Sequence, residues 1–392
     1  MHLEKAAYLY KLTKALNLNS KSIELSKIDK KLEGSTPPGV FIGEYGYPKV
    51  FIGPMLTAVC DGCEIFDLPE LWLQQKKSVQ DIINFRLSLI RGKYQTNITK
   101  LNDKFVQKLQ ELALAKKSVA SEAEFKSKPK GLSLNEEYLP FGPSAELSKF
   151  EIGNVHWQSD LQKVYYDKDL RAKDAVITLY SKGLLFSQIQ KALSVGAMGL
   201  NKNRKLVPTK WSITAVDDIL GKHLLEEVRQ NPIIENYCVF EFSAFNNHFT
   251  VLLMPTSWQF ENFEAFIRIL NNEIMIYRDW EPWEGRKKYS EQAGGYYSTR
   301  FAIAEYLQKI GKQAGALIFR EVYPHYMPLG VWTIRESIRN ALKQNPKEFF
   351  DLKSALTYIG SKLYLPLSYY TSQSKLLKLN RQQTKLNIFF KI

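Results

Sequence analysis

Two stretches of the chain each hold a pair of β-type apolar runs separated by a short turn-forming segment. The first pair lies in residues 40–54, around the glycine- and proline-bearing segment Gly43–Pro48. The second pair is Tyr237–Phe242 and Phe249–Met254, separated by Ser243–His248. Runs of Val, Ile, Phe and Tyr bounded by Gly, Pro, Asn and Ser are typical of β-hairpins. The sequence therefore predicts two hairpins, and an all-helical fold is excluded.

Helical periodicity dominates much of the remaining chain. Residues 71–125 are predicted to be helical, because Leu101, Phe105, Leu109 and Leu112 recur at spacings of three and four. Towards the end, residues 314–323 have the pattern of a strand and residues 331–342 that of a helix. We therefore expect a mixed α/β (α+β) fold, with a helix-rich body, β-hairpins and a mobile C-terminal tail.

Changes in composition suggest three parts of the chain. Residues 1–35 alternate Lys with Leu and Ile and are expected to form an N-terminal arm. Residues 36–369 form the body, with an internal boundary at 126–143, where proline and glycine are frequent. Residues 370–392 are rich in Lys, Ser and Gln, so we expect a flexible tail.

The composition limits the partners that the protein could bind and the compartment in which it could work. The chain has 54 Lys and Arg against 40 Asp and Glu, a formal net charge of +14, which favours partners that carry phosphates, such as DNA. No apolar run is long enough to cross a bilayer, and residues 1–19 lack the apolar core of a signal peptide. Three cysteines are too few for a disulfide scaffold. We therefore expect a cytoplasmic protein without a membrane partner.

The last ten residues hold a compact apolar motif. Gln383 is followed by an aliphatic residue three positions on, Leu386, and by two aromatic residues six and seven positions on, Phe389 and Phe390. In a 3₁₀ turn, Gln383, Leu386 and Phe389 share one side. This spacing matches the motif by which DNA enzymes bind the replication sliding clamp, proliferating cell nuclear antigen. The alternative is an amphipathic last turn that packs on the protein's own core.

Several dense segments of the body resemble the archaeal Nre family of DNA-repair proteins, over about residues 36–392. They are Phe41–Val50 with Gly53–Pro54, Arg204–Asp218, Gly285–Lys287, Gly294–Tyr297 and Pro328–Trp332. The resemblance implies a repair role coupled to the clamp, but no particular reaction. It also implies a zinc finger near the start of some relatives, whereas this chain has no four-cysteine cluster there. Glu44 stands where the resemblance leads us to expect a basic residue.

Two constellations could carry chemistry. Asp217 and Asp218 are adjacent carboxylates that could hold a divalent metal or share acid and base work, or could simply lie in the first turn of a capped helix. Arg286, Arg300 and Glu305 accompany glycines and aromatic residues in a segment that could bind a phosphate and a base, or could form surface ion pairs. If all five residues converge, they would form the pocket of a lesion-processing enzyme.

Two further patterns are weaker. Cys60 and Cys63 have the spacing of half a zinc site, but Cys238 is the only other cysteine, so we favour a structural role. Residues 174–196 hold two short helical patterns around Lys182 and Gly183, which either form a helix-turn-helix or pack as core helices.

Together these features predict a DNA-repair protein that binds DNA and is recruited to the clamp. The alternatives are a metal-dependent nuclease or base-removing hydrolase acting on damaged DNA, and a non-catalytic clamp adaptor.

Overall fold

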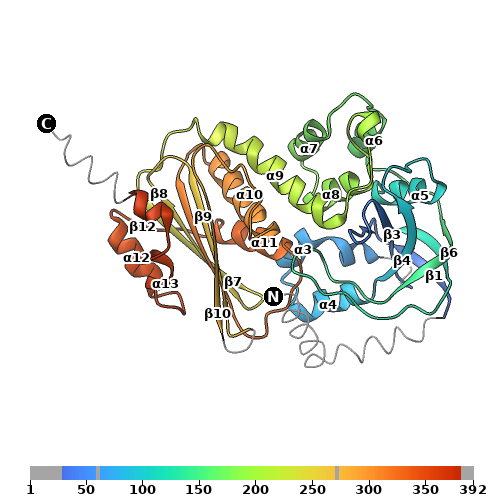
Figure 1. The fold of residues 1–392 in the computed structure, drawn as a ribbon, viewed down its shortest axis with the longest axis horizontal. Coiled ribbons are helices and arrows are strands. Elements are labelled where there is room, and N and C mark those ends of the chain that lie inside the picture. The colour runs from blue at the N-terminus through green and yellow to red at the C-terminus, as the bar shows by residue number, and fades with distance from the viewer. Residues whose placement is uncertain (1–28, 59–61, 270–272, 381–392) are drawn as a thin grey trace. The chain divides into compact units, whose positions relative to one another are not determined.

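The computed structural model describes residues 29–58, 62–269 and 273–380, and the chain folds into two compact units (Figure 1). The N-terminal unit comprises the described part of Leu9–Leu220 together with Pro328–Trp332. The C-terminal unit comprises Gly221–Met327 and the described part of Thr333–Ile392. Each unit is built on one six-stranded mixed sheet, so the expected mixed α/β class is confirmed.

The sheet of the N-terminal unit has the strand order β1-β5-β6-β4-β3-β2. Its strands pair antiparallel except for β4 and β6, which run parallel. The strands are β1 Lys31–Thr36, β2 Val40–Ile42, β3 Lys49–Leu56, β4 Ile90–Asn97, β5 Val119–Phe125 and β6 Ser144–Ile152. The helices are η1 Cys63–Asp67, α3 Pro69–Gln74, α4 Val79–Leu87, α5 Lys104–Ala113, α6 Ser159–Tyr166, α7 Ala172–Ser181, α8 Phe186–Ser194 and η2 Asn201–Asn203.

The sheet of the C-terminal unit has the order β10-β9-β11-β8-β7-β12, with β9 and β11 parallel. The strands are β7 Tyr237–Ala244, β8 Asn247–Met254, β9 Gln259–Ile267, β10 Ile274–Glu281, β11 Gly315–Val322 and β12 Lys347–Phe349. The helices are α10 Gly294–Lys309, α11 Trp332–Ala341, α12 Leu352–Gly360 and α13 Ser368–Thr371. The division between the units falls within α9, Thr209–Val228.

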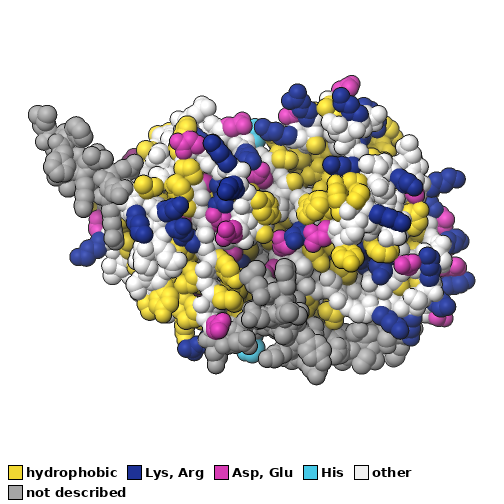
Figure 2. Space-filling view, in the orientation of Figure 1, with side chains coloured by type: hydrophobic (Ala, Val, Ile, Leu, Met, Phe, Trp, Pro, Cys, Tyr) yellow, Lys and Arg dark blue, Asp and Glu magenta, His cyan; other side chains and the backbone are white. Residues whose placement is uncertain are grey.

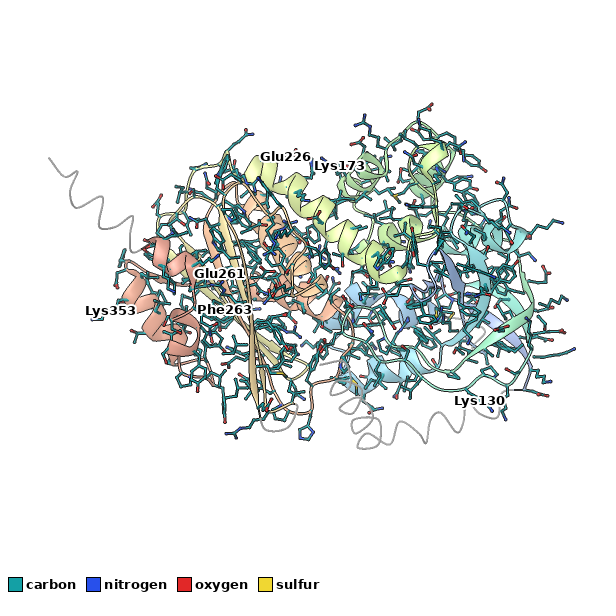
Figure 3. The ribbon with its side chains drawn as sticks, in the orientation of Figure 1. Lys130, Lys173, Glu226, Glu261, Phe263 and Lys353 are labelled. Carbon is teal, nitrogen blue, oxygen red and sulfur yellow. The ribbon has the colours of Figure 1, made fainter. Side chains whose placement is uncertain are left out.

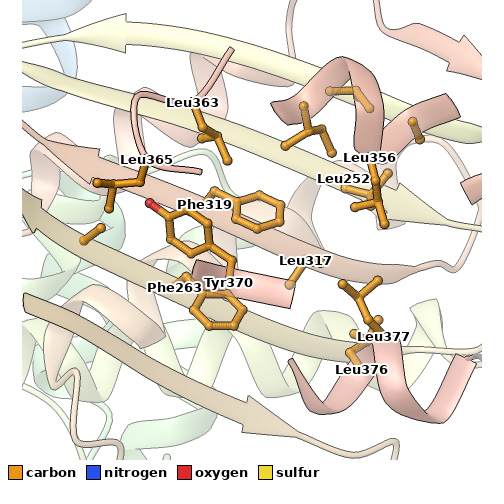
Figure 4. Close-up of a cluster of buried hydrophobic side chains, with 14 of the residues drawn as sticks. Leu252, Phe263, Leu317, Phe319, Leu356, Leu363, Leu365, Tyr370, Leu376 and Leu377 are labelled. Carbon is orange, nitrogen blue, oxygen red and sulfur yellow. The ribbon is translucent and has the colours of Figure 1, made fainter. Parts of the chain in front are cut away.

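Helices cover both faces of this second sheet. On one face α10 packs through Tyr296 against Phe260 and through Tyr306 against Phe240. On the other face, α12, α13 and the residues that follow close a buried cluster around Phe263 (Figure 4). Alternate residues of β9 therefore face opposite helical layers, as expected for a strand buried on both sides.

Both predicted hairpins are confirmed. β2 pairs antiparallel with β3, and β7 pairs antiparallel with β8. The second hairpin turns through Phe245 and Asn246, each with φ of 55°. Two successive left-handed residues give the turn a twist that matches the strands, and asparagine tolerates this conformation better than most residues.

The helical prediction for residues 71–125 is only partly correct. α3, α4 and α5 lie in this range, but so do the strands β4 and β5. β5 has the sequence Val-Ala-Ser-Glu-Ala-Glu-Phe, and its residues alternate between buried and more exposed positions. Ala and Glu are strong helix formers, but here the period-two burial pattern decides the conformation.

The boundaries also differ from those expected. Residues 126–143 lie inside the N-terminal unit, where Ser133 and Phe141 form a β-bridge. The last residues of the expected arm belong to β1, which pairs with β5. Residues 370–380 do not form a tail, because Tyr370, Leu376 and Leu377 are buried in the C-terminal core. Apolar burial and backbone pairing therefore extend the folded body beyond the limits that composition suggests.

Within the described residues, no helix has the length and apolarity needed to span a membrane.

Candidate nucleic-acid interface

One carboxylate, that of Asp279, fixes the conformation of the loop between β10 and α10. Asp279, near the end of β10, pairs with the Arg286 guanidinium and accepts a hydrogen bond from Ser290 Oγ. It also accepts one from the backbone N–H of Glu291, at 3.1 Å. Arg286 donates further to the carbonyl oxygens of Trp280, Lys288 and Tyr289. The contacts of Asp279 and Arg286 therefore fix the conformation of this loop.

The ion pair between Arg286 and Asp279 also shifts the pKa of the arginine. Burial alone would lower the pKa of Arg286, but the hydrogen bond and the charge of Asp279 outweigh it and raise the pKa. The guanidinium also lies over the ring of Tyr296, at 5.0 Å from the ring centroid. The arginine remains charged, and its charge is matched by Asp279.

A second ion pair lies at the beginning of α10. Glu281 is fully buried and its Oε2 accepts from Arg300 Nη1 at 3.0 Å. The same carboxylate accepts from Tyr296 Oη at 2.8 Å and from Trp258 Nε1 at 3.3 Å. Burial and the neighbouring Glu281 raise the pKa of Tyr296, so its hydroxyl stays protonated and donates. This arrangement is a buried ion pair, and removing one partner would leave a buried charge.

The outer layer of the same segment is exposed. Lys287 and Lys288 are exposed, as are the large rings of Trp283 and Tyr289. Arg229 lies with its guanidinium carbon 5.4 Å from the Trp283 ring centroid. We call these five residues the basic loop surface. Cations beside exposed rings can bind phosphates and stack on bases, which is the chemistry of a nucleic-acid interface.

Arg229 has one hydrogen-bond donor that no described residue accepts from. Its Nε is buried and has no hydrogen-bond partner among the described residues. Burial lowers the pKa of Arg229, and the nearby Arg300 lowers it further, while Glu281 and other acids act in the opposite direction. In Figure 2, charged side chains of both signs are scattered among hydrophobic and other side chains.

The five candidate catalytic residues are distributed over both units. Asp217 and Asp218 lie on α9 in the N-terminal unit, and Asp217 is fully buried. Arg286, Arg300 and Glu305 lie in the C-terminal unit. The structure brings Arg286 and Arg300 to the same ring, Tyr296.

Glu305 is engaged elsewhere. It accepts two hydrogen bonds of 2.7 Å from Arg339 on α11, a bidentate pair. Arg339 also binds Glu336 at 2.7 Å. Burial would lower the pKa of Arg339, but Glu336 and Glu305 raise it. Glu305 thus ties α10 to α11.

The remaining candidates lie partly outside the described residues. Cys60 and the clamp-binding residues Gln383, Leu386, Phe389 and Phe390 are not among them. Cys63 is buried, its Sγ lies 3.0 Å from Ser118 Oγ, and burial raises the pKa of its thiol. No cluster of three or more His, Cys, Asp or Glu side chains that could hold a metal occurs in the part of the chain that the structure describes.

The two short helices of residues 174–196 are α7 and α8. α8 is buried along nearly its whole length. Its Ser187 binds Glu70 through both the backbone N–H and the hydroxyl, and Lys191 pairs with Asp67. A recognition helix needs an exposed face that can enter a groove. The burial of α8 therefore favours its interpretation as a core helix.

The sequence places Asp279 in the same segment as these arginines, but it does not show that Asp279 binds Arg286 and Ser290, and it gives no sign of Arg229. Asp279 stands near the end of β10, and no local signal links it to Ser290 or Arg286. Arg229 stands more than fifty residues before Trp283. Only the fold brings such distant residues together.

Family models and individual relatives all relate this chain to the archaeal Nre proteins. The models of the archaeal Nre N-terminal and C-terminal regions match residues 9–269 and 281–389. DNA repair protein NreB of Archaeoglobus fulgidus is 37% identical over 364 residues, covering 91% of this chain and 92% of the relative. DNA repair protein NreA of the same organism is 35% identical, covering 84% and 85%.

DNA repair protein NreA of Haloferax volcanii is 33% identical, covering 86% of this chain and 84% of the relative. No solved structure shows a significant match. Both regions of the family are thus present, and the resemblance noted in the sequence is confirmed. The chain belongs to the archaeal Nre family.

Proposed function

We propose that this protein is a DNA-repair factor that binds DNA and is recruited to the replication sliding clamp, proliferating cell nuclear antigen, by the motif Gln383–Phe390. Three relatives that match most of the chain are named DNA repair proteins, which supports the repair role. The net charge of +14 supports DNA as a partner.

The observation that carries the recruitment proposal is the position of the motif relative to the folded core. Residues 374–376 are fixed to the sheet by Glu261, a buried residue of β9 (Figure 3). Its carboxylate accepts from Ser374 Oγ at 2.5 Å and from the backbone N–H groups of Lys375 and Leu376 at 2.9 and 3.1 Å. The motif begins only a few residues after this anchor.

A short peptide of this kind can bind well. Burial of Leu386 and two phenylalanine rings would contribute roughly 1.5–3 kcal/mol per side chain before ordering costs, which suffices for micromolar affinity. The core of the C-terminal unit is closed by Leu376 and Leu377. The motif begins after Leu377, so Leu376 and Leu377 can stay in the core when the motif binds the clamp.

The test is calorimetric titration of the full-length protein with the sliding clamp of its host. Replacement of both Phe389 and Phe390 by alanine should reduce affinity by about thirtyfold or more per ring, because aromatic anchors of this kind contribute roughly 2 kcal/mol or more each. Asn387→Ala, at a position that the motif does not define, is the matched control and should bind like the wild type.

Equal affinity of wild type and double variant would exclude the recruitment proposal. So would a large fall in the melting temperature of the double variant, because that would show that the rings pack on their own protein.

Within this proposal, the described contacts favour a non-catalytic adaptor over a nuclease. Arg286, Arg300 and Glu305 each form an ion pair inside the fold. Incubation of labelled intact and damaged DNA with the purified protein, with and without Mg²⁺ or Mn²⁺, separates the two. Metal-dependent cleavage would establish the nuclease.

A further inference from the structure

Three large aromatic side chains are exposed on the N-terminal unit, and the clamp-recruitment proposal gives them no role. Tyr45 and Tyr47 lie in the turn between β2 and β3, and Trp211 lies in the first turn of α9. Their exposed fractions are 91%, 41% and 42%. The Tyr47 and Trp211 rings lie 5.0 Å apart between centroids and are tilted by 49°. We call these three residues the aromatic platform.

Hydrogen bonds fix the turn and the helix that carry the aromatic platform. The backbone N–H of Ile42 donates to Thr209 Oγ1 at 2.9 Å, which joins β2 to the start of α9. Trp211 Nε1 donates to Glu44 Oε2 at 3.2 Å, which orients the indole. Gly46 has φ of 81°, and a Cβ atom there would lie 2.8 Å from Lys49 O, so the turn requires glycine at this position. The Tyr47 and Trp211 rings are therefore preorganised although they are exposed, and Tyr45 stands in the same fixed turn.

Such exposure is not explained by folding. A ring that stays almost entirely in water contributes little burial free energy, so Tyr45 adds nothing substantial to the core. Tyr47 and Trp211 contact each other but keep about two fifths of their surface open. Rigid rings with free faces are suited to receive another flat group.

Lysines border the platform. The backbone N–H of Ile98 donates to Pro48 O, and Leu206 N–H donates to Ile98 O, so Lys49 and Lys205 stand on neighbouring segments. Lys49 also pairs in register with Asn97, and the turn at Asn97 brings the chain to Lys100. Lys49, Lys100 and Lys205 are all exposed. None of these three forms an ion pair with a described residue.

A further cation lies under the hairpin. Arg91 donates from Nη2 to Phe51 O at 3.0 Å and lies over the Phe41 ring at 4.3 Å. No carboxylate pairs with it among the described residues, and burial lowers its pKa to about 10. Glu44 lies 3.6 Å from Lys210, and Lys210 pairs more closely with Glu137, at 2.7 Å. Lys49, Lys100, Lys205 and Arg91 outnumber these two carboxylates, so the local charge remains positive.

We propose that the aromatic platform binds unpaired bases of single-stranded DNA by stacking, while Lys49, Lys100 and Lys205 contact the phosphates. This inference rests on the proposed function, because it specifies the form of DNA that the protein recognises. Stacking of bases on aromatic side chains and pairing of phosphates with lysine are the two components of single-strand binding. In intact duplex DNA the faces of the bases are covered by their neighbours, so the platform selects unpaired regions.

The test is fluorescence anisotropy of a labelled oligothymidine strand and of a blunt duplex, titrated with the full-length protein at fixed salt. The variant combines Tyr45→Ala and Trp211→Ala. Loss of stacking should weaken single-strand binding by roughly fivefold to a hundredfold and leave duplex binding within about twofold. Trp211→Phe keeps a stacking ring and should retain most of the single-strand affinity.

Phe350→Ala is the matched control, because Phe350 is 94% exposed and lies outside the platform. It should bind both DNAs like the wild type. If the wild type binds DNA and the Tyr45/Trp211 variant binds single strands equally well, the platform is excluded while DNA binding stands. If the wild type binds neither DNA, both proposals fail. Melting curves by circular dichroism confirm that each variant is folded.

Discussion

His248 shows how burial controls a single ionisable residue in the C-terminal unit. Its two ring nitrogens lie 2.8 Å from Ser243 Oγ and 3.0 Å from Thr250 Oγ1. Burial lowers the pKa of His248, and Lys362 adds to this effect, while Glu241 and Glu321 oppose it. The folded protein therefore resists protonation of this ring.

A pH dependence follows from that shift. As the pH falls from about 7 to about 5, an unfolded histidine takes up a proton near its ordinary pKa of about 6.5, whereas folded His248 resists. The unfolded state then binds more protons, so the free energy of unfolding decreases as the pH falls. We expect His248→Gln to show a smaller decrease over this window, measured by urea denaturation.

Exposed His156, replaced by glutamine, is the control and should follow the wild type. Parallel stability curves for His248→Gln and the wild type would show that this ring titrates equally in both states.

Single residues also mark the limit of sequence reasoning. Arg286 and Arg300 could be selected from the sequence because they stand in a glycine- and aromatic-rich segment. Asp279 and Glu281 stand in the same segment, but their pairings with these arginines could not be predicted, because they depend on how the loop after β10 folds back on the strand. The exposure of Trp211 could be expected from its neighbours, but its contact with Tyr47 joins residues that are far apart in sequence.

Among secondary-structure elements, strands rich in β-forming residues on either side of a clear turn were predictable, and strands with mixed signals were not. β7 and β8 are rich in Val, Leu and Phe and flank a clear turn, so their pairing followed from the sequence. β4 has the sequence Ile-Arg-Gly-Lys-Tyr-Gln-Thr-Asn, with few apolar residues to show a period. Its strand conformation depends on pairing with β3 and β6, which no local pattern specifies.

The last described residues provide a test of where the folded body ends. A chain that stops after Asn380 keeps the three donors to Glu261 and should melt within about 2 °C of the full-length protein. A chain that stops after Gln373 loses those donors together with Leu376 and Leu377. Its unfolding free energy should fall by about 4 kcal/mol or more, since two buried leucines and a buried carboxylate lose their contacts.

Calorimetric melting of both truncated proteins distinguishes these cases. Equal stability of the two would contradict the anchoring role of Glu261, and a marked loss in the longer form would assign a structural role to the residues after 380.

Over the whole molecule, the excess of 14 positive charges predicts DNA binding that depends strongly on salt. Each phosphate contact should add about 0.9 to the slope of log affinity against log salt on duplex DNA. Lys287→Ala with Lys288→Ala should lower this slope by up to about 1.8, if both residues of the basic loop surface contact phosphates. Binding of labelled duplex at several salt concentrations measures the slope.

Lys347→Ala with Lys353→Ala removes the same charge from β12 and α12 and should leave the slope unchanged. A wild-type slope near zero would show that the positive charge of the molecule does not serve DNA binding.

Under the recruitment proposal, the anchor at Glu261 would also determine how far the folded body can stand from the clamp. Leu377 is fixed in the core, and Gln383 lies six residues further along the chain. Even a fully extended segment of that length reaches only about 20 Å. So short a tether would confine the body to the immediate neighbourhood of the ring, where its effective concentration on the encircled DNA is in the millimolar range, as is typical of short linkers. Weak contacts with DNA would then be sufficient, because the clamp would keep the protein beside its substrate.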